Sequence, residues 1–158
     1  MGNIKSDMEY RKEVAMWQAQ GPAIDGSKIK EYIIEYLNKT GHKYSRVHVS
    51  NTWNIDYAKF AQMTKINDPS HIIWLKFTKK GHVVVVGAGN DINQEGEKSS
   101  ALLKAAGEEW DMEKVFVIPI KGLKGKGHHQ EERNAVERGI GDYLISKGVP
   151  IIDFYSHK

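Results

Sequence analysis

Residues 71–87, with the sequence HIIWLKFTKKGHVVVVG, decide the fold of this chain. Two runs rich in β-branched and aromatic residues flank Lys79-Lys80-Gly81, which has the length and the glycine of a hairpin loop. The run from Val83 to Val86 does not alternate with polar residues, which is typical of strands that are covered on both faces. We therefore expect a β-hairpin whose second strand lies in the centre of a sheet.

Helical and strand patterns alternate after the hairpin. Apolar residues at helical spacing predict helices over residues 95–110 and 129–147, and short apolar runs predict strands over residues 114–119 and 150–155. The order from residue 71 onward is then β-β-α-β-α-β. This order indicates an α/β (α+β) fold, a mixed β-sheet with helices packed across it.

The N-terminal third is rich in helical patterns. The sequence predicts helices over residues 7–19, 27–39 and 54–64, with a short strand at residues 47–49. Ser27 is the expected N-cap of the second helix. Tyr10, Val14 and Trp17 form an apolar stripe on the first helix, and we expect this stripe in the core.

The composition bounds the class of protein. A chain of 158 residues that is 40% hydrophobic and 27% charged predicts one soluble globular domain over residues 1–158. The absence of cysteine excludes disulfides, thiolate nucleophiles and cysteine-based zinc sites. No apolar run is long enough to span a membrane and no signal peptide is recognisable, so we expect a cytoplasmic protein. Met1 to Ser6 fits the N-myristoylation pattern at Gly2, but an ordinary start codon explains it more simply.

A basic, glycine-rich loop is the first candidate binding element. Residues 120–127 contain Lys121, Lys124 and Lys126 with three glycines and no acidic residue, and they precede a predicted helix N-terminus. Glycines allow close backbone approach, lysines attract phosphates, and a helix N-terminus favours anions. Arg133 and Asn90 complete the predicted substrate-binding set. The alternative is a flexible surface loop whose lysines provide solubility, and the net charge of +3 permits an anionic partner without requiring one.

Two histidines and two glutamates follow this loop. Extending the apolar stripe of the helix backward from Val136 predicts that His129 and Glu132 face inward, whereas His128 should be more exposed. A carboxylate can orient an imidazole that acts as a general acid or base near neutral pH. The structural alternative is that carboxylates in the first turn only interact favourably with the helix dipole.

A metal site is a second interpretation of the same residues. His129 and Glu132 could supply two ligands of a divalent metal, completed by His48, Asn90 or Asp91. His48 is also the best second histidine for catalysis, because its strand can approach from another part of the sheet. The sequence leaves the cofactor open: a divalent metal is the candidate, and a cysteine-bound zinc is excluded.

Two segments together resemble cytidine-deaminase-like toxin domains of bacterial polymorphic toxins. They are residues 127–135, GHHQEERNA, and residues 148–156, GVPIIDFYS, within a similar region that covers residues 71–156. In that family, zinc is bound by a His or Cys and a later Cys pair, and a Glu acts as the proton shuttle. Because this chain has no cysteine, the resemblance implies a shared layout and excludes a working deaminase of that design.

Two functions remain. The first is a nucleic-acid- or nucleotide-directed enzyme that cleaves phosphodiesters by His/Glu chemistry beside the lysine-rich loop, with His129 or His128 as acid or base and Glu132 as its partner. Such an enzyme would suit a bacterial or phage effector, with RNA, DNA or a nucleotide as its ligand and an inhibitory protein as a further partner. The alternative is a non-catalytic module on a deaminase-like scaffold that binds a protein or a nucleotide, for which four Trp and seven Tyr provide aromatic surface.

Overall fold

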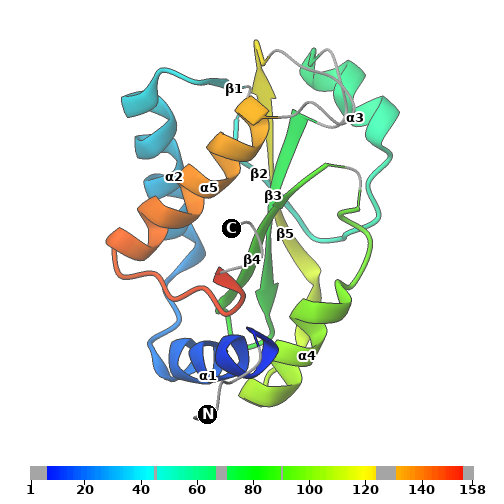
Figure 1. The fold of residues 1–158 in the computed structure, drawn as a ribbon. Coiled ribbons are helices and arrows are strands. Elements are labelled where there is room, and N and C mark those ends of the chain that lie inside the picture. Colours follow the sequence, from blue (N-terminus) through cyan, green and yellow to red (C-terminus); the bar gives the residue numbers. More distant parts are fainter. Residues whose placement is uncertain (1–6, 45, 67–70, 90, 124–130, 155–158) are drawn as a thin grey trace.

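The computed structural model describes residues 7–44, 46–66, 71–89, 91–123 and 131–154 (Figure 1). The helices are α1 (Asp7–Gln20), α2 (Gly26–Thr40), α3 (Tyr57–Thr64), α4 (Glu97–Ala106) and α5 (Glu131–Ser146). The strands are β1 (Lys43–Tyr44), β2 (His48–Ser50), β3 (Ile72–Thr78), β4 (Val83–Ala88) and β5 (Trp110–Lys121). These elements form an α+β fold in which the helices pack against a sheet, as the sequence predicts.

The five-stranded sheet is built around β5. Its order is β1-β5-β3-β4, and β2 also pairs with β5. Every pair of these strands is antiparallel, and the predicted hairpin of β3 and β4 is confirmed. A strand is expected over residues 150–155, but the structure has an isolated parallel bridge between Val83 and Ile151 in its place.

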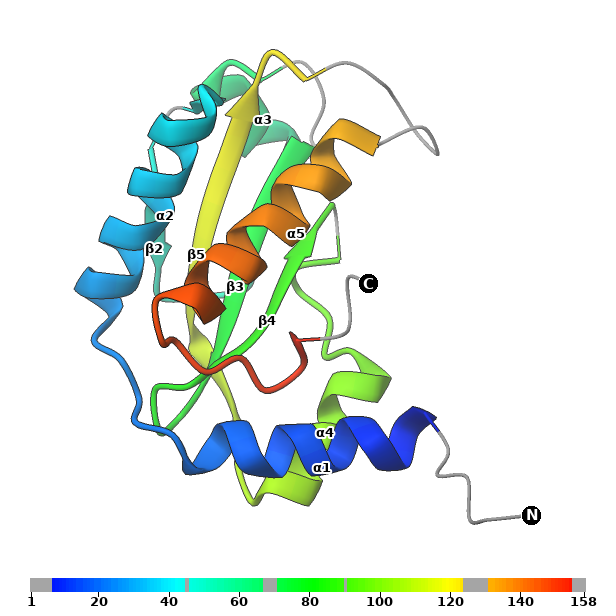
Figure 2. The ribbon, with the colours of Figure 1, turned by 60° about the vertical axis from the view of Figure 1, so that its left-hand side comes forward.

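Two apolar clusters cover the two faces of the sheet. One cluster joins α2 and α5 to the face that carries Ile73, Leu75 and Phe77 of β3. The other joins α1, α3 and α4 to the face that carries Ile72 and Trp74. Figures 1 and 2 show α2 beside α5 and α1 beside α4. Because successive strand residues point to opposite faces, β3 contributes alternately to both clusters.

The position of β4 differs from the sequence prediction. Residues 83–87 are buried, so this strand is covered on both faces as expected. However, β4 is an edge strand of the sheet and pairs with β3 on one side. On its other side, the described residues form an isolated bridge between Val83 and Ile151. A continuous apolar run reports burial of both faces and does not distinguish a central strand from a covered edge.

The apolar stripe predicted for α1 is also wrong. Trp17 is 76% exposed and Tyr10 is 49% exposed, whereas Arg11 and Ala15 are buried. Arg11 Nη2 donates a hydrogen bond to Asp153 Oδ1 at 2.5 Å, so an ion pair and a small residue decide which face of α1 is turned inward. Helical spacing alone predicts a face that is rotated by about 100° around the helix axis, the angle between successive residues.

The N-cap of α2 is Asp25 and not Ser27. The Asp25 Oδ1 atom accepts a hydrogen bond from the Ser27 backbone N–H at 3.1 Å. The helix therefore begins at Gly26, one residue earlier than predicted. Both residue types can cap a helix, and the carboxylate lies in the capping position here.

Candidate functional site

A pocket of about 250 Å³ opens on the sheet face that α4 covers. We call it the Lys76 pocket. Its walls come from β3, β4, the turn after β4, the start of α4, β5 and α5, and its main side chains are Trp74, Lys76, Asp91, Ser99, Trp110 and Glu137. The continuous segment from β3 to the start of α4 therefore meets β5 and α5 at one small cavity.

Lys76 is buried in an aromatic environment. Only 1% of its surface is exposed. Its Nζ atom lies 4.3 Å from the ring centroid of Trp53, 4.4 Å from that of Trp74 and 5.8 Å from that of Trp110. The same atom donates a hydrogen bond to the backbone oxygen of Gln94 at 2.5 Å. The rings and the carbonyl stabilise a cation that has left water.

Burial alters the proton affinity of this amine. The loss of water around the ammonium lowers the pKa of Lys76 to about 8, and the carboxylates of Asp91 and Glu95 act in the opposite direction. A substantial fraction of the side chain is therefore neutral at mildly alkaline pH. A neutral lysine amine is a base and a nucleophile, unlike its ammonium form.

Glu137 supplies a protonatable carboxyl group to the same pocket. Burial raises the pKa of Glu137 to about 7, and the negative charge of Asp91 raises it further. The guanidinium groups of Arg133 and Arg138 oppose this increase. Both forms of the carboxyl group are consequently populated near neutral pH, which suits a general acid or base.

The carboxylate of Asp91 acts electrostatically on both titratable groups of the pocket, Lys76 and Glu137. Its carboxylate raises the pKa of both Lys76 and Glu137, and the residue itself is exposed. The pocket thus combines an amine, a protonatable carboxyl and an exposed carboxylate. Such perturbed titratable groups in a concave site are a physical indicator of function.

Arg133 lies beside the turn that follows β4. Its Nη1 atom is 3.5 Å from the position that a Cβ atom on Gly89 would occupy. The guanidinium also donates to Asn134 Oδ1 from Nε at 3.3 Å and from Nη2 at 3.0 Å. A cationic group therefore stands next to the pocket residues of this turn.

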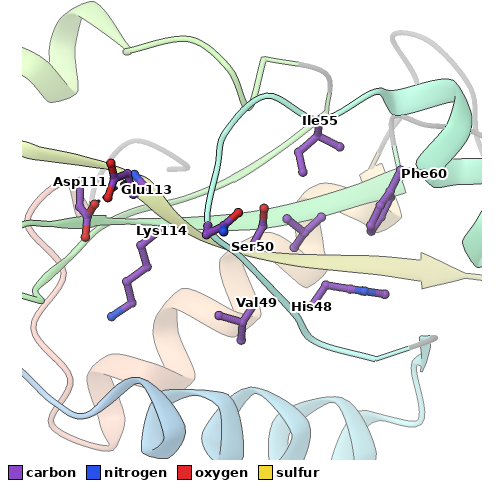
Figure 3. A pocket seen from close by; sticks show the side chains of 10 residues that line it. His48, Val49, Ser50, Ile55, Phe60, Asp111, Glu113 and Lys114 are labelled. Atoms are coloured by element: carbon purple, nitrogen blue, oxygen red, sulfur yellow. Dashed lines mark hydrogen bonds between the residues drawn. The ribbon is translucent and has the colours of Figure 1, made fainter.

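His48 lines a different pocket, of about 690 Å³ (Figure 3). Its ring makes an edge-to-face contact with Phe60, with the centroids 5.0 Å apart, and its Nδ1 atom accepts a hydrogen bond from Arg46 Nε at 3.2 Å. Burial lowers the pKa of His48, and the nearby charges of Arg46 and Lys30 lower it further. Figure 3 shows His48 and Phe60 at one end of this pocket and the carboxylates of Asp111 and Glu113 at the other.

The structure does not bring His48 to the start of α5. His48 stacks on α3, which covers one face of the sheet, whereas α5 packs on the opposite face with α2. In addition, β5 and β3 lie between β2 and β4 in the sheet. His48 therefore lies apart from the described first turn of α5, which contains Glu132.

Glu132 does not face inward. It is exposed in the first turn of α5, and the buried side chains of this helix include Val136, Ile140 and Leu144. The first turns present Arg133 and Glu137, each partly buried, toward the Lys76 pocket and its rim. Counting back four residues from Val136 predicts that Glu132 faces inward, whereas counting back three predicts Arg133. A helix with 3.6 residues per turn permits either count, and the structure has Arg133 partly buried and Glu132 exposed.

Several predicted site residues lie outside the described residues. These are His128, His129, Lys124, Lys126 and Asn90. Lys121 is described, and it lies half-buried at the end of β5, paired in register with Lys43.

The sequence analysis missed Lys76, its tryptophans and Glu137. The available signal was a lysine inside an otherwise apolar strand, between Leu75 and Phe77, in a segment that also contains Trp74. A charged residue in a strand buried on both faces needs partners, and aromatic rings are one class of partner. That pattern marks Lys76 as unusual. It does not indicate Glu137, because Glu137 lies on α5, far from Lys76 in the sequence.

Comparison with known proteins adds no relative. No family model, no curated protein and no solved structure matches this chain. The described residues contain no group of three or more His, Asp or Glu side chains placed to hold a metal ion. Within that same part of the chain, no helix has the length and apolar character needed to cross a membrane.

Proposed function

We propose that this chain is a nucleic-acid- or nucleotide-directed enzyme that works at the Lys76 pocket and its rim. One observation supports the proposal above the others: a protonatable carboxyl, a buried amine and two indole rings line the same small cavity. Aromatic rings stack with nucleobases regardless of sequence, and a carboxyl group with a pKa near neutrality can transfer protons.

Arg133 places a cationic group at the rim of this pocket. The guanidinium stands beside Gly89 at the turn, four residues before Glu137 on the same helix. Residues four apart share a helix face, so a phosphate held by Arg133 would lie near the Glu137 carboxyl. In this mechanism Arg133 and lysines such as Lys121 hold the phosphate, and Glu137 moves the proton during phosphodiester cleavage. His129, which precedes α5, remains the proposed second acid or base.

The test is turnover of defined substrates. The protein is incubated with tRNA, single-stranded DNA and nucleotides, with EDTA or with added Mg²⁺ or Mn²⁺. Glu137→Gln should reduce cleavage by roughly 100-fold or more, as expected for the loss of a general acid or base. The matched control is Glu131→Gln, on an exposed residue of the same helix, and it should change the rate less than threefold (about 0.6 kcal/mol). Equal rates for both variants, or no turnover under any condition, would contradict the proposal.

A non-catalytic binding module is the second candidate, and the surface of α1 favours it. Tyr10, Met16 and Trp17 are each about half exposed or more. Exposed aromatic and methionine side chains are enriched at protein interfaces. An effector with an inhibitory protein partner would fit this surface. Binding of RNA, DNA or a protein that occurs without turnover under every metal condition would favour the module over the enzyme.

A further inference from the structure

Lys76 differs from the other lysines in its environment. Among the lysines of the described residues it is the buried one, and it nevertheless lines a cavity. Lys114 is the closest comparison, because its Nζ atom also lies over an aromatic ring, 4.2 Å from the centroid of Phe77. Lys114 is only partly buried, however, and lines the larger and separate pocket that contains His48.

The contacts of the Lys76 amine are suited to holding a neutral nitrogen as well as a cation. Its hydrogen-bond acceptor within the described residues is the backbone oxygen of Gln94, and the neighbouring indole rings of Trp53, Trp74 and Trp110 are apolar. A carbonyl accepts a hydrogen bond from a neutral amine as it does from an ammonium, whereas a carboxylate in contact would favour the charged form strongly. The charged groups that act on the amine are Asp91 and Glu95, and Glu137 lines the same pocket.

From this geometry we infer that the Lys76 amine is a covalent site for small aldehydes and ketones, with which it forms an imine inside the pocket. A cavity of about 250 Å³ beside the amine accommodates a molecule of a few heavy atoms. The surrounding rings exclude water, which favours condensation over hydrolysis. This inference concerns the amine alone and stands whether or not the pocket acts on nucleic acid.

The reaction is balanced within the pocket. The nitrogen lone pair attacks the carbonyl carbon, so a C–N bond forms as the C=O π bond breaks, and one proton passes from nitrogen to the former carbonyl oxygen to give a carbinolamine. The hydroxyl group is then protonated and leaves as water while the nitrogen lone pair forms the C=N bond. The nitrogen finally loses its second proton, which leaves the neutral imine. Glu137 is the carboxyl group of the pocket that can give a proton to the leaving hydroxyl and recover one afterwards, because both of its forms are populated near neutral pH.

The fraction of neutral amine sets the selectivity. With a pKa of about 8, about a tenth of the Lys76 amines are neutral at pH 7. An exposed lysine with a pKa near 10.4 has roughly one neutral amine in 2,500 at the same pH. Accessibility reduces this advantage, since the amine must release the Gln94 carbonyl first. We expect Lys76 to react at least about 10-fold faster than Lys114 at pH 7.

Reductive trapping tests the inference. The folded protein is incubated with acetaldehyde and sodium cyanoborohydride between pH 6 and 10, and the ethylated lysines are quantified by peptide mapping. The rate at Lys76 should exceed that at Lys114 at pH 7 and reach a plateau above about pH 8, whereas exposed lysines should continue to gain reactivity toward pH 10. The preference for Lys76 should vanish in the chain unfolded by guanidinium.

Two variants complete the experiment. Lys76→Arg keeps a buried cation but removes the nucleophile, so the dominant adduct should disappear. Lys114→Arg should leave labelling of Lys76 unchanged. Labelling of Lys76 in the folded protein that is no faster than labelling of Lys114 would overturn the inference. Because no nucleic acid is present, this result is independent of the turnover assay for phosphodiester cleavage.

Discussion

The Trp74 indole packs directly against the backbone of Gly87, its register partner on β4. A Cβ atom built on Gly87 would overlap the Trp74 ring, so any larger residue at this point of β4 would displace the ring or the strand. The ring in turn lies 4.4 Å from the Lys76 ammonium, and its Nε1 atom donates to the Gly89 backbone oxygen at 3.3 Å. Trp74 and Lys76 are two residues apart on one strand and therefore share a face.

Replacing this glycine should damage the pocket. Gly87→Ala places a methyl group where the Trp74 ring lies, and overpacking of this kind costs about 1–3 kcal/mol of the free energy of unfolding. Urea denaturation measures the loss, and tryptophan fluorescence reports the displaced ring. Gly96→Ala is the matched control in the same pocket, because the nearest atom to its added Cβ, Ser99 Oγ, lies 3.6 Å away. The control should cost less than about 1 kcal/mol, and equal losses would show that Trp74 can move at little cost.

The stability of the protein should depend on the charge of Lys76. The pKa is about 8 in the folded state and 10.5 as the ordinary value, so the unfolded chain binds more protons between these pH values. The free energy of unfolding should therefore rise from pH 8 to pH 10.5 by on the order of 2 kcal/mol from this residue. Lys76→Met removes that contribution, and the measurement is the difference between wild type and variant in urea titrations at each pH. A difference that stays constant over this interval would contradict the buried position of the amine.

Glu137 should produce the opposite dependence at lower pH. The pKa of Glu137 is about 7 in the folded state and 4.5 ordinarily, so the folded chain binds more protons between these values. The contribution of Glu137 to the free energy of unfolding is therefore fully present below pH 4.5. It falls by on the order of 2 kcal/mol as the pH rises to 7. Glu137→Gln stays neutral and should be more stable than wild type at pH 7.5 but equal to it near pH 4. The exposed Glu131→Gln control should follow wild type throughout.

The hairpin and the helical periods of this chain could be predicted from sequence, because local pattern determines them. The fold class, the β3–β4 hairpin and helices α2 and α5 agree with those patterns within a few residues. The inward face of α1 could not be predicted, since Arg11 is buried through a contact with Asp153, which is 142 residues away in the chain. Such a partner is invisible to a local period.

The site was less accessible to sequence reasoning than the fold. Lys76 belongs to β3, Glu137 to α5 and Trp110 to β5, and only the folded sheet brings them to one cavity. Sequence proximity instead favoured the cluster from His128 to Glu132, of which the structure describes Glu131 and Glu132, both exposed. Side chains that are adjacent in sequence can point in different directions, so they need not meet at one site.

The buried pair of Arg11 and Asp153 should hold α1, α4 and the C-terminal segment together. Asp153 is 1% exposed, and its two carboxylate oxygens accept hydrogen bonds from Arg11 at 2.5 Å and from Ser99 Oγ at 2.6 Å. Asp153→Asn removes the buried counter-charge of the guanidinium and leaves the exposed Asp7 carboxylate, 3.8 Å from Arg11 Nη1, as its partner. Breaking a buried pair of this kind costs about 3–5 kcal/mol of the free energy of unfolding. Adding Arg11→Met to this variant removes the buried guanidinium, so the double variant should recover part of the loss. The four proteins form a double-mutant cycle measured by urea denaturation. Lys28→Met is the control on an exposed ion pair, and it should leave the free energy of unfolding almost unchanged. Additive effects of the two substitutions would mean that the pair is not coupled, and α1 would then be held to α4 by its apolar contacts alone.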